Sequence, residues 1–178
     1  VVAAVAIEIV IVFVVAEAGR ILLQRRATTK YHFGGRWSNT CCRHQRPGEA
    51  PDAAARRRLG EELEIRADQL DVVGRFEYRA VDPASGLVEH ELDHVVIATT
   101  NDTRVAWSPL ESLRDVLGGH ATILTPWFAP ALEVMLAAIA MDPTLGERYP
   151  AIASCAVGMR SNDVSAAVDA SEQKSMTC

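Results

Sequence analysis

The chain has 178 residues, which is enough for one domain whose core needs no disulfide or metal to hold it together. Its formal net charge is −5, and no basic stripe with interleaved aromatic residues is present, so the sequence gives no sign of a nucleic-acid partner. Arginines nevertheless cluster locally, within 20–26, 36–46 and 56–58, and such clusters suit a phosphorylated small molecule.

The four cysteines do not form a recognisable framework. Cys41 and Cys42 are adjacent, Cys155 lies far away, and Cys178 is the last residue. This spacing matches neither a zinc site nor a set of disulfides, so we expect a reducing, cytoplasmic setting.

The first sixteen residues are apolar apart from Glu8 and are rich in valine and isoleucine. A membrane-spanning helix needs roughly 20 apolar residues, and β-branched residues favour strands, so the sequence predicts a buried strand and no membrane span. A turn at 17–19 contains a glycine, and the run from Arg20 to Arg26 follows it. The sequence therefore predicts a hairpin from about Val5 to Arg26.

The segment 27–48 has little periodicity but many side chains of functional types. They include Lys30, Tyr31, His32, Trp37 and His44. Loops this rich in such side chains are more often sites than connectors, so we expect this loop to contribute to a site.

A helix is predicted over 49–65. Pro51 falls in its first turn and Asp52 lies near the positive end of its dipole, which are both helix-start signals. Arg58 and Glu62 are four residues apart on one side of this helix. Taken alone, they predict an ordinary surface ion pair worth a fraction of ~1 kcal/mol.

A second hairpin is predicted from strands at 72–80 and 87–99 around the turn 82–86. A short strand at 104–107 and a helix at 108–117 follow, the helix with Ser108 as its N-cap and Pro109 in its first turn. A longer apolar helix is predicted over 125–141. Beyond Tyr149 the sequence becomes rich in alanine, serine and aspartate, so we expect one α/β domain over 1–150 and a poorly ordered tail over 151–178.

Two pairs of residues have a spacing that would place both members of the pair in one functional site. Cys42 and His44 are two residues apart, so they face the same side of an extended segment. Glu89 and Glu91 likewise share one strand face, where two close carboxylates either raise one pKa or need a cation between them. Metal binding, acid–base catalysis and an ordinary solvated strand face all remain open for the glutamates.

Six segments in a fixed order give these residues a context. Together they resemble the type I isopentenyl-diphosphate isomerases of the Nudix superfamily, over about Val12 to Leu136. The segments are QRRATTK (Gln24 to Lys30), WSNTCCRH (Trp37 to His44), PGE (Pro47 to Glu49), RRRLGEEL (Arg56 to Leu63), FEYRAVDPASGLVEHE (Phe76 to Glu91) and TPW (Thr125 to Trp127). The resemblance implies an α/β (α+β) fold with a Nudix-like mixed sheet sandwiched between helices. The general Nudix box is degenerate at Arg57, Arg58 and Glu64, which disfavours a Nudix hydrolase.

The resemblance also implies a reaction, the isomerisation of isopentenyl diphosphate to dimethylallyl diphosphate through a tertiary carbocation. It makes Cys42 and Glu91 the two proton-transfer residues, on opposite faces of the double bond, with Tyr78 assisting beside Glu91. Trp127 then presents a π-face to the cation.

The same resemblance assigns the diphosphate group. Arg26, Lys30 and Arg58 match the residues that grip its oxygens, and Glu62 matches the residue that reaches a Mg²⁺ held by the diphosphate. The expected partner is thus a small prenyl diphosphate bound to a monomer or a homodimer.

A second divalent metal is implied at His44, Glu89 and Glu91, where imidazole and carboxylate ligands suit Zn, Mn, Fe or Mg. The family builds this site from three histidines and two glutamates, and two of the histidines are absent here. One would fall before residue 1, and the other falls near Ile7 or Glu8. A shift of one residue in the hairpin would place Glu8 there as a substitute carboxylate.

The incomplete metal site keeps two alternatives open. The first is an isomerase-like enzyme that performs proton-initiated cyclisation or rearrangement of a longer prenyl chain. The second is a non-catalytic Nudix-fold module that binds a diphosphate without turnover.

Overall fold

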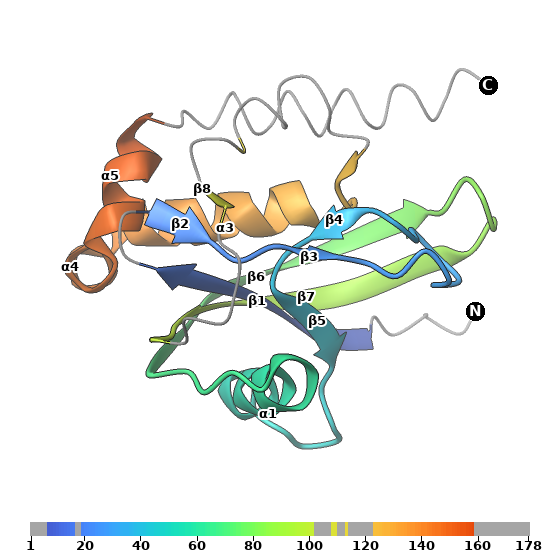
Figure 1. The fold of residues 1–178 in the computed structure, drawn as a ribbon, viewed down its shortest axis with the longest axis horizontal. Coiled ribbons are helices and arrows are strands. Elements are labelled where there is room, and N and C mark those ends of the chain that lie inside the picture. Colours follow the sequence, from blue (N-terminus) through green and yellow to red (C-terminus); the bar gives the residue numbers. More distant parts are fainter. Residues whose placement is uncertain (1–6, 17–18, 102–107, 110–112, 114–122, 159–178) are drawn as a thin grey trace.

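A six-stranded mixed sheet forms the middle layer of the computed structural model (Figure 1), which describes residues 7–16, 19–101, 108–109, 113 and 123–158. The strands of the sheet are β1 (Ile7–Ala16), β2 (Arg20–Ile21), β5 (Cys41–His44), β6 (Gln69–Val81), β7 (Val88–Thr99) and β8 (Ser108–Pro109). They follow the order β6-β7-β1-β2-β8, and β5 also pairs with β1. A separate small sheet joins β3 (Gln24–Arg25) to β4 (Trp37–Ser38).

Strand β1 lies in the middle of the large sheet and confirms the strand predicted for the apolar N-terminal run. It is parallel to β7 and antiparallel to β2 and β5. All residues from Ile9 to Val15 are buried, as expected for a strand that is covered on both faces. Among the described residues, no helix is long and apolar enough to span a membrane.

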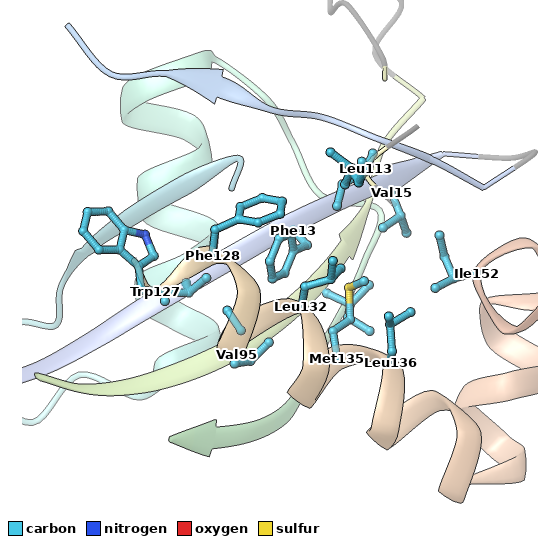
Figure 2. Close-up of a cluster of buried hydrophobic side chains, with 14 of the residues drawn as sticks. Phe13, Val15, Val95, Leu113, Trp127, Phe128, Leu132, Met135, Leu136 and Ile152 are labelled. Atoms are coloured by element: carbon cyan, nitrogen blue, oxygen red, sulfur yellow. The ribbon is translucent and has the colours of Figure 1, made fainter. Parts of the chain in front are cut away.

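Alternate residues of β1 enter two different cores, because successive side chains of a strand point to opposite faces. The odd-numbered residues pack toward α3 (Phe128–Met141), and Figure 2 shows Phe13 of β1 beside Phe128 and Leu132 of that helix. The even-numbered residues Val12 and Val14 pack with α1 (Pro51–Leu63). The sheet therefore lies between helices, as predicted.

The first hairpin is confirmed, but its second strand is shorter than predicted. Strand β2 pairs with the end of β1 only through Arg20 and Ile21. The hydroxyl of Thr40 then inserts between the two segments: it accepts from Val14 N at 2.8 Å and donates to Leu22 O at 2.7 Å. The chain leaves the large sheet there and pairs again as β3 with β4.

The second hairpin and the helices α1 and α3 are confirmed with small shifts of their ends. Strands β6 and β7 pair along their whole length, with a bulge between Val72 and Gly74. The predicted helix start at Ser108 and Pro109 is wrong, because both residues form β8 against β2. A proline fits there because β8 lies at the edge of the sheet. The predicted strand at 104–107 and most of the predicted helix after it lie outside the described residues.

The C-terminal part of the described chain is more ordered than the sequence predicts. Helices α4 (Pro143–Arg148) and α5 (Pro150–Gly158) follow α3, so residues 151–158 of the predicted tail are helical. Ile152 is only 1% exposed and joins the α3 core. Tyr149 Oη donates to Asp71 Oδ2 of β6 at 2.6 Å, and Arg148 pairs with the same carboxylate. Residues 159–178 lie outside the described part of the chain.

Replacing Ile152 with alanine tests whether α5 belongs to the folded domain. Removal of a fully buried isoleucine side chain should lower the free energy of unfolding by about 2–5 kcal/mol. The exposed Ser154 on the same helix is the matched control, and Ser154→Ala should change the stability by less than about 0.5 kcal/mol. Urea unfolding followed by circular dichroism measures both, and equal stability of the two variants would contradict the packing of α5.

Candidate active site

A cavity of about 440 Å³ opens beside the N-terminal end of β1. Its wall comes from β1, β5, β7, the loop before β4 and the residue that precedes α3. The lining residues are Ile7, Ile9, Arg26, Lys30, Tyr31, His32, Cys42, Arg43, His44, Leu87, Val88, Glu89, His90, Glu91 and Trp127. Most of the residues predicted for the site are therefore brought together, although they come from segments far apart in the sequence.

The alternation of side chains along β5 places Cys42, rather than Cys41, at this cavity. Cys42 pairs with Ile11 and lies on the α3 side of the sheet, whereas Cys41 pairs with Val12 and packs toward α1. Burial raises the pKa of the Cys42 thiol well above its usual range, and the nearby carboxyls of Asp93 and Glu91 raise it further. The thiol is thus held in its neutral form. None of the three described cysteines forms a disulfide.

Glu89 and Glu91 lie on the same face of β7 and share one hydrogen-bond donor. Tyr78 Oη, on the neighbouring strand β6, lies 2.8 Å from Glu89 Oε2 and 2.9 Å from Glu91 Oε2. Burial raises the pKa of Glu89 to about 7, and burial also raises the pKa of Glu91, while the Tyr78 hydroxyl opposes both shifts. Glu89 is therefore poised to hold or release a proton near neutral pH, and Glu91 holds its proton more readily than a carboxyl in water.

Asp93 extends this row of acids and was missed by the sequence analysis. It follows Glu91 by two residues on the same strand face, is 0% exposed, and has no hydrogen-bond partner for either carboxylate oxygen. Burial raises its pKa to about 8, with further contributions from Glu91 and Glu89. The spacing of Glu89, Glu91 and Asp93 is a signal that could have found it, because every second residue of a strand shares a face.

His32 is the second residue that received no role from the sequence. Its Nε2 atom contacts the Glu89 carboxylate, and Arg26 Nη2 donates to the same nitrogen at 2.9 Å. Burial lowers the pKa of His32, and the charge of Arg26 lowers it further, so the ring is neutral. The Arg26 guanidinium also lies 5.1 Å from the centre of the Trp127 ring.

The Trp127 ring is fixed from its polar edge. The side chain is 2% exposed, and its Nε1–H lies 3.1 Å from both Ser38 Oγ and Asn39 Oδ1. Ser38 Oγ is in turn 3.0 Å from the hydroxyl of Thr125. These bonds explain the residue types in the WSNT and TPW segments, because they hold one face of the indole toward the cavity.

Three predicted site residues do not line the cavity, and of these only Tyr78 contacts lining residues through its hydroxyl, namely Glu89 and Glu91. Arg58 and Glu62 lie on α1, do not line the cavity, and form an ion pair with each other, while Arg58 also bonds Glu61 at 2.6 Å. The suggested role of Glu8 as a substitute metal ligand is wrong for a geometric reason. Glu8 pairs with Leu92, so it lies on the face opposite Glu91, and Ile7 takes the position that faces the cavity.

The acids at the cavity have the chemistry of a divalent-cation site without forming a closed centre. Among the described residues, no group of three or more histidine, cysteine, aspartate or glutamate side chains is arranged closely enough to hold a metal ion. Burial raises the pKa values of Glu89 and Glu91, and neither carboxylate oxygen of Asp93 has a hydrogen-bond partner. Only the types of donor present, carboxylate oxygen and imidazole nitrogen, are ones that divalent metals accept.

The raised pKa of Asp93 predicts that the stability of the metal-free protein depends on pH. The folded state holds a proton that the unfolded chain releases near its ordinary pKa of ~4, so a rise in pH favours unfolding. The protonated Asp93 carboxyl thus contributes its full stabilisation of the folded state below about pH 4. This contribution is lost as the pH rises through about 8. Asp93→Asn keeps an uncharged side chain, so its melting temperature in EDTA should fall less between pH 5 and pH 8 than that of the wild type. Parallel falls in the two proteins would contradict the assignment of a buried, protonated Asp93.

Comparison with known proteins identifies the family. Residues 7–126 match the model of the NUDIX domain. The chain is 45% identical over 130 residues to an isopentenyl-diphosphate Delta-isomerase of Nocardia farcinica, covering 68% of this chain and 74% of the relative. With the isopentenyl-diphosphate Delta-isomerase of Halorhodospira halophila it shares 51% identity over 100 residues, 56% of this chain and 57% of the relative.

Solved structures support the fold alone. The MutT protein of Methanosarcina mazei Go1 superimposes with a TM-score of 0.55 at 19% identity, over 75% of this chain and 94% of that one. A NUDIX hydrolase of Nitrosomonas europaea gives a TM-score of 0.54 at 14% identity, over 75% and 90% of the two chains. With its fold and most of its expected site residues in place, the chain belongs to the isopentenyl-diphosphate Delta-isomerase family within the NUDIX superfamily.

Proposed function

We propose that this protein converts isopentenyl diphosphate to dimethylallyl diphosphate. The observation that carries the proposal is the placement of Cys42 and Glu91 on strands at either side of β1, with both side chains lining the same cavity beside Trp127. A cavity of about 440 Å³ is within the usual size of small-molecule sites, which run from roughly 300 to 1,000 Å³.

The reaction needs one proton donor and one proton acceptor but no net gain or loss of atoms. A proton is added to the terminal carbon of the double bond, and a tertiary carbocation forms at the neighbouring carbon. A second proton then leaves the carbon on the other side, and the double bond re-forms there. Cys42 and Glu91 perform the two transfers from opposite faces. Burial keeps the Cys42 thiol protonated, so it can act as the donor. Burial also raises the pKa of Glu91, which makes its carboxylate a stronger proton acceptor than in water.

Trp127 stabilises the cation between these two groups. The approach of the Arg26 guanidinium to 5.1 Å from the ring centre supports this role, since the indole already contacts one cation in this cavity. The hydrogen bonds from Trp127 Nε1 to Ser38 and Asn39 keep the ring in place during the reaction.

The diphosphate binds at the mouth of the cavity, where Arg26 and Lys30 supply positive charge. A Mg²⁺ bound to the diphosphate neutralises its oxygens, and Glu62 is its proposed protein ligand, with Arg58 as a third basic contact. Both α1 residues are ion-paired in the structure, so these two roles require that pair to open.

A second divalent metal is proposed at His44, Glu89 and Glu91. When bound, it supplies positive charge that stabilises the ionised carboxylates. Tyr78 orients these two carboxylates through its hydroxyl. Cyclisation of a longer prenyl chain and a non-catalytic binding module are both less favoured, since relatives at 40–56% identity are named as isomerases.

The adjacent cysteines offer a matched test of this function. Cys42→Ala should lower the rate of dimethylallyl diphosphate formation by at least about 100-fold, because one proton-transfer group is lost. Cys41→Ala removes the same atoms from the α1 side of the strand and should keep a rate close to that of the wild type. Proton NMR of isopentenyl diphosphate in D₂O, with Mg²⁺ and Mn²⁺ present, follows both the product and deuterium incorporation.

Two results would count against this assignment. Full activity of Cys42→Ala would remove Cys42 from the proton transfers. A folded wild-type chain that binds isopentenyl diphosphate but neither isomerises it nor exchanges its protons would favour the non-catalytic module.

A further inference from the structure

Two buried polar residues, Asn39 and Thr40, connect β4 to β5. Only 1% of Asn39 and none of Thr40 is exposed. The Thr40 hydroxyl bridges two backbone segments, as described for the first hairpin. The Asn39 amide forms a second bridge, which reaches from the Trp127 indole to the backbone of the neighbouring strands.

The Asn39 amide forms hydrogen bonds at both of its ends. Its Oδ1 accepts from Trp127 Nε1 at 3.1 Å and from Ser38 Oγ at 2.8 Å. Its Nδ2 donates to the backbone oxygen of Cys41 and, at 3.3 Å, to that of Val12. Carbonyl oxygens only accept and an indole N–H only donates, so the network fixes which end of the amide faces which partner. The side chain therefore cannot turn without breaking these bonds.

The two ends of the amide reach two different parts of the proposed chemistry. The oxygen end holds the indole of Trp127, whose face lines the cavity. The nitrogen end is bonded to the residue directly before Cys42, and Cys41 pairs with Val12 in the ladder of β5 and β1. Asn39 thus joins the aromatic ring to the strand segment that carries the thiol.

Ser38 also contacts the indole but makes a different set of bonds. Its hydroxyl lies 3.1 Å from Trp127 Nε1, 2.8 Å from Asn39 Oδ1 and 3.0 Å from the Thr125 hydroxyl. None of these contacts, which are those of the Ser38 hydroxyl in the described part of the chain, reaches the backbone of β1 or β5. Ser38 can therefore hold the ring, whereas Asn39 can also set its place relative to Cys42.

From these contacts we infer that Asn39 is a positioning residue of the reaction, which fixes the Trp127 ring relative to the Cys42 thiol. This inference rests on the proposed function, in which the thiol and the ring act on the same substrate. Proton transfer depends steeply on geometry, and a misplacement of about 1 Å can lower a rate by about 100-fold. Arg26 and Lys30 make no described bond to Asn39, so its loss acts on kcat rather than on substrate binding.

The kinetic parameters of Asn39 variants test this role. Asn39→Ala and Asn39→Ser should each lower kcat for dimethylallyl diphosphate formation by at least about tenfold and change KM by less than about twofold. Ser38→Ala should lower kcat less than either, because the bonds from Asn39 to β5 and β1 remain. Circular dichroism establishes that each variant is folded at the assay temperature.

A control variant separates lost positioning from a general loss of stability. Ile152 lies at the far end of the hydrophobic cluster from Trp127 (Figure 2). Ile152→Ala should therefore keep a kcat close to that of the wild type, although its stability is lowered. Unchanged kcat in the folded Asn39 variants would overturn the inference, and so would an increase in KM without a fall in kcat.

A double-mutant cycle tests whether Asn39 acts through the indole. Trp127→Phe keeps an aromatic face but has no N–H for Asn39 to hold. In this background Asn39→Ala should lower kcat by less than about threefold, because residues that act through one contact do not have additive effects. Equal fold losses from Asn39→Ala in the two backgrounds would show that Asn39 acts elsewhere and would overturn the inference.

The hydrogen bond itself is measured without turnover by NMR of ¹⁵N-labelled protein. The indole N–H signal of Trp127 is identified by its absence from Trp127→Phe. In the wild type it should exchange with D₂O more slowly than that of Trp37, whose residue is 40% exposed. In the Asn39 variants it should change position and exchange faster.

The outcomes for the link and for the enzyme are separable. Exchange of the wild-type Trp127 signal as fast as that of Trp37 would overturn the link even where no Asn39 variant folds. A protected signal in a wild-type chain that does not isomerise isopentenyl diphosphate would overturn the proposed function, and with it the role in catalysis, while the link between Asn39 and Trp127 stands.

Discussion

The alternation of side chains along β1 and its partners determines most of what this protein can do. Strand β1 is covered on both faces, and its register with β5 and β7 fixes which residues meet. On the α3 side this brings Cys42 and Glu91 to one cavity. A shift of one residue would present Cys41 in the ladder with β5, or Leu92 in the ladder with β7. The chemistry of the site therefore depends on a register that the two hydrophobic cores on either side of the sheet enforce.

Burying three acids on one strand face has an energetic cost that explains other features of the cavity. Glu89, Glu91 and Asp93 all have raised pKa values, because burial disfavours their charged forms. A shared proton donor from Tyr78 offsets part of this cost for the two glutamates but does not reach Asp93, whose oxygens have no partner. A bound cation would offset the remainder. The three acids thus favour the binding of either a proton or a metal ion, since each would reduce the buried negative charge.

Much of the fold follows from local pattern, while the exceptions depend on contacts distant in sequence. The buried β1, the β6–β7 hairpin and the helices α1 and α3 were predicted because their periodicity and turn residues are visible in the sequence. The early end of β2 was not, since it depends on the hydroxyl of Thr40 reaching Val14. Helix α5 was missed because its alanine-rich sequence has little periodicity, and the burial of Ile152 becomes apparent only against α3.

The candidate site divides in a similar way. Cys42, Glu91, Tyr78 and Trp127 were predicted from ordered segments, and the strands bring them together. His32 was visible in the sequence, but its contact with Glu89 depends on the path of a loop that contains a left-handed phenylalanine, which no local rule predicts.

Arg26 contacts several side chains of the candidate site at once. Its guanidinium faces the Trp127 ring, donates to His32 and lines the cavity in which the proposed diphosphate substrate would bind. A diphosphate is a stronger acceptor than a neutral imidazole, because the hydrogen bond gains from both charges. Its arrival would draw Arg26 away from His32. Because the charge of Arg26 lowers the pKa of Glu89, this movement would favour the protonated form of that carboxyl.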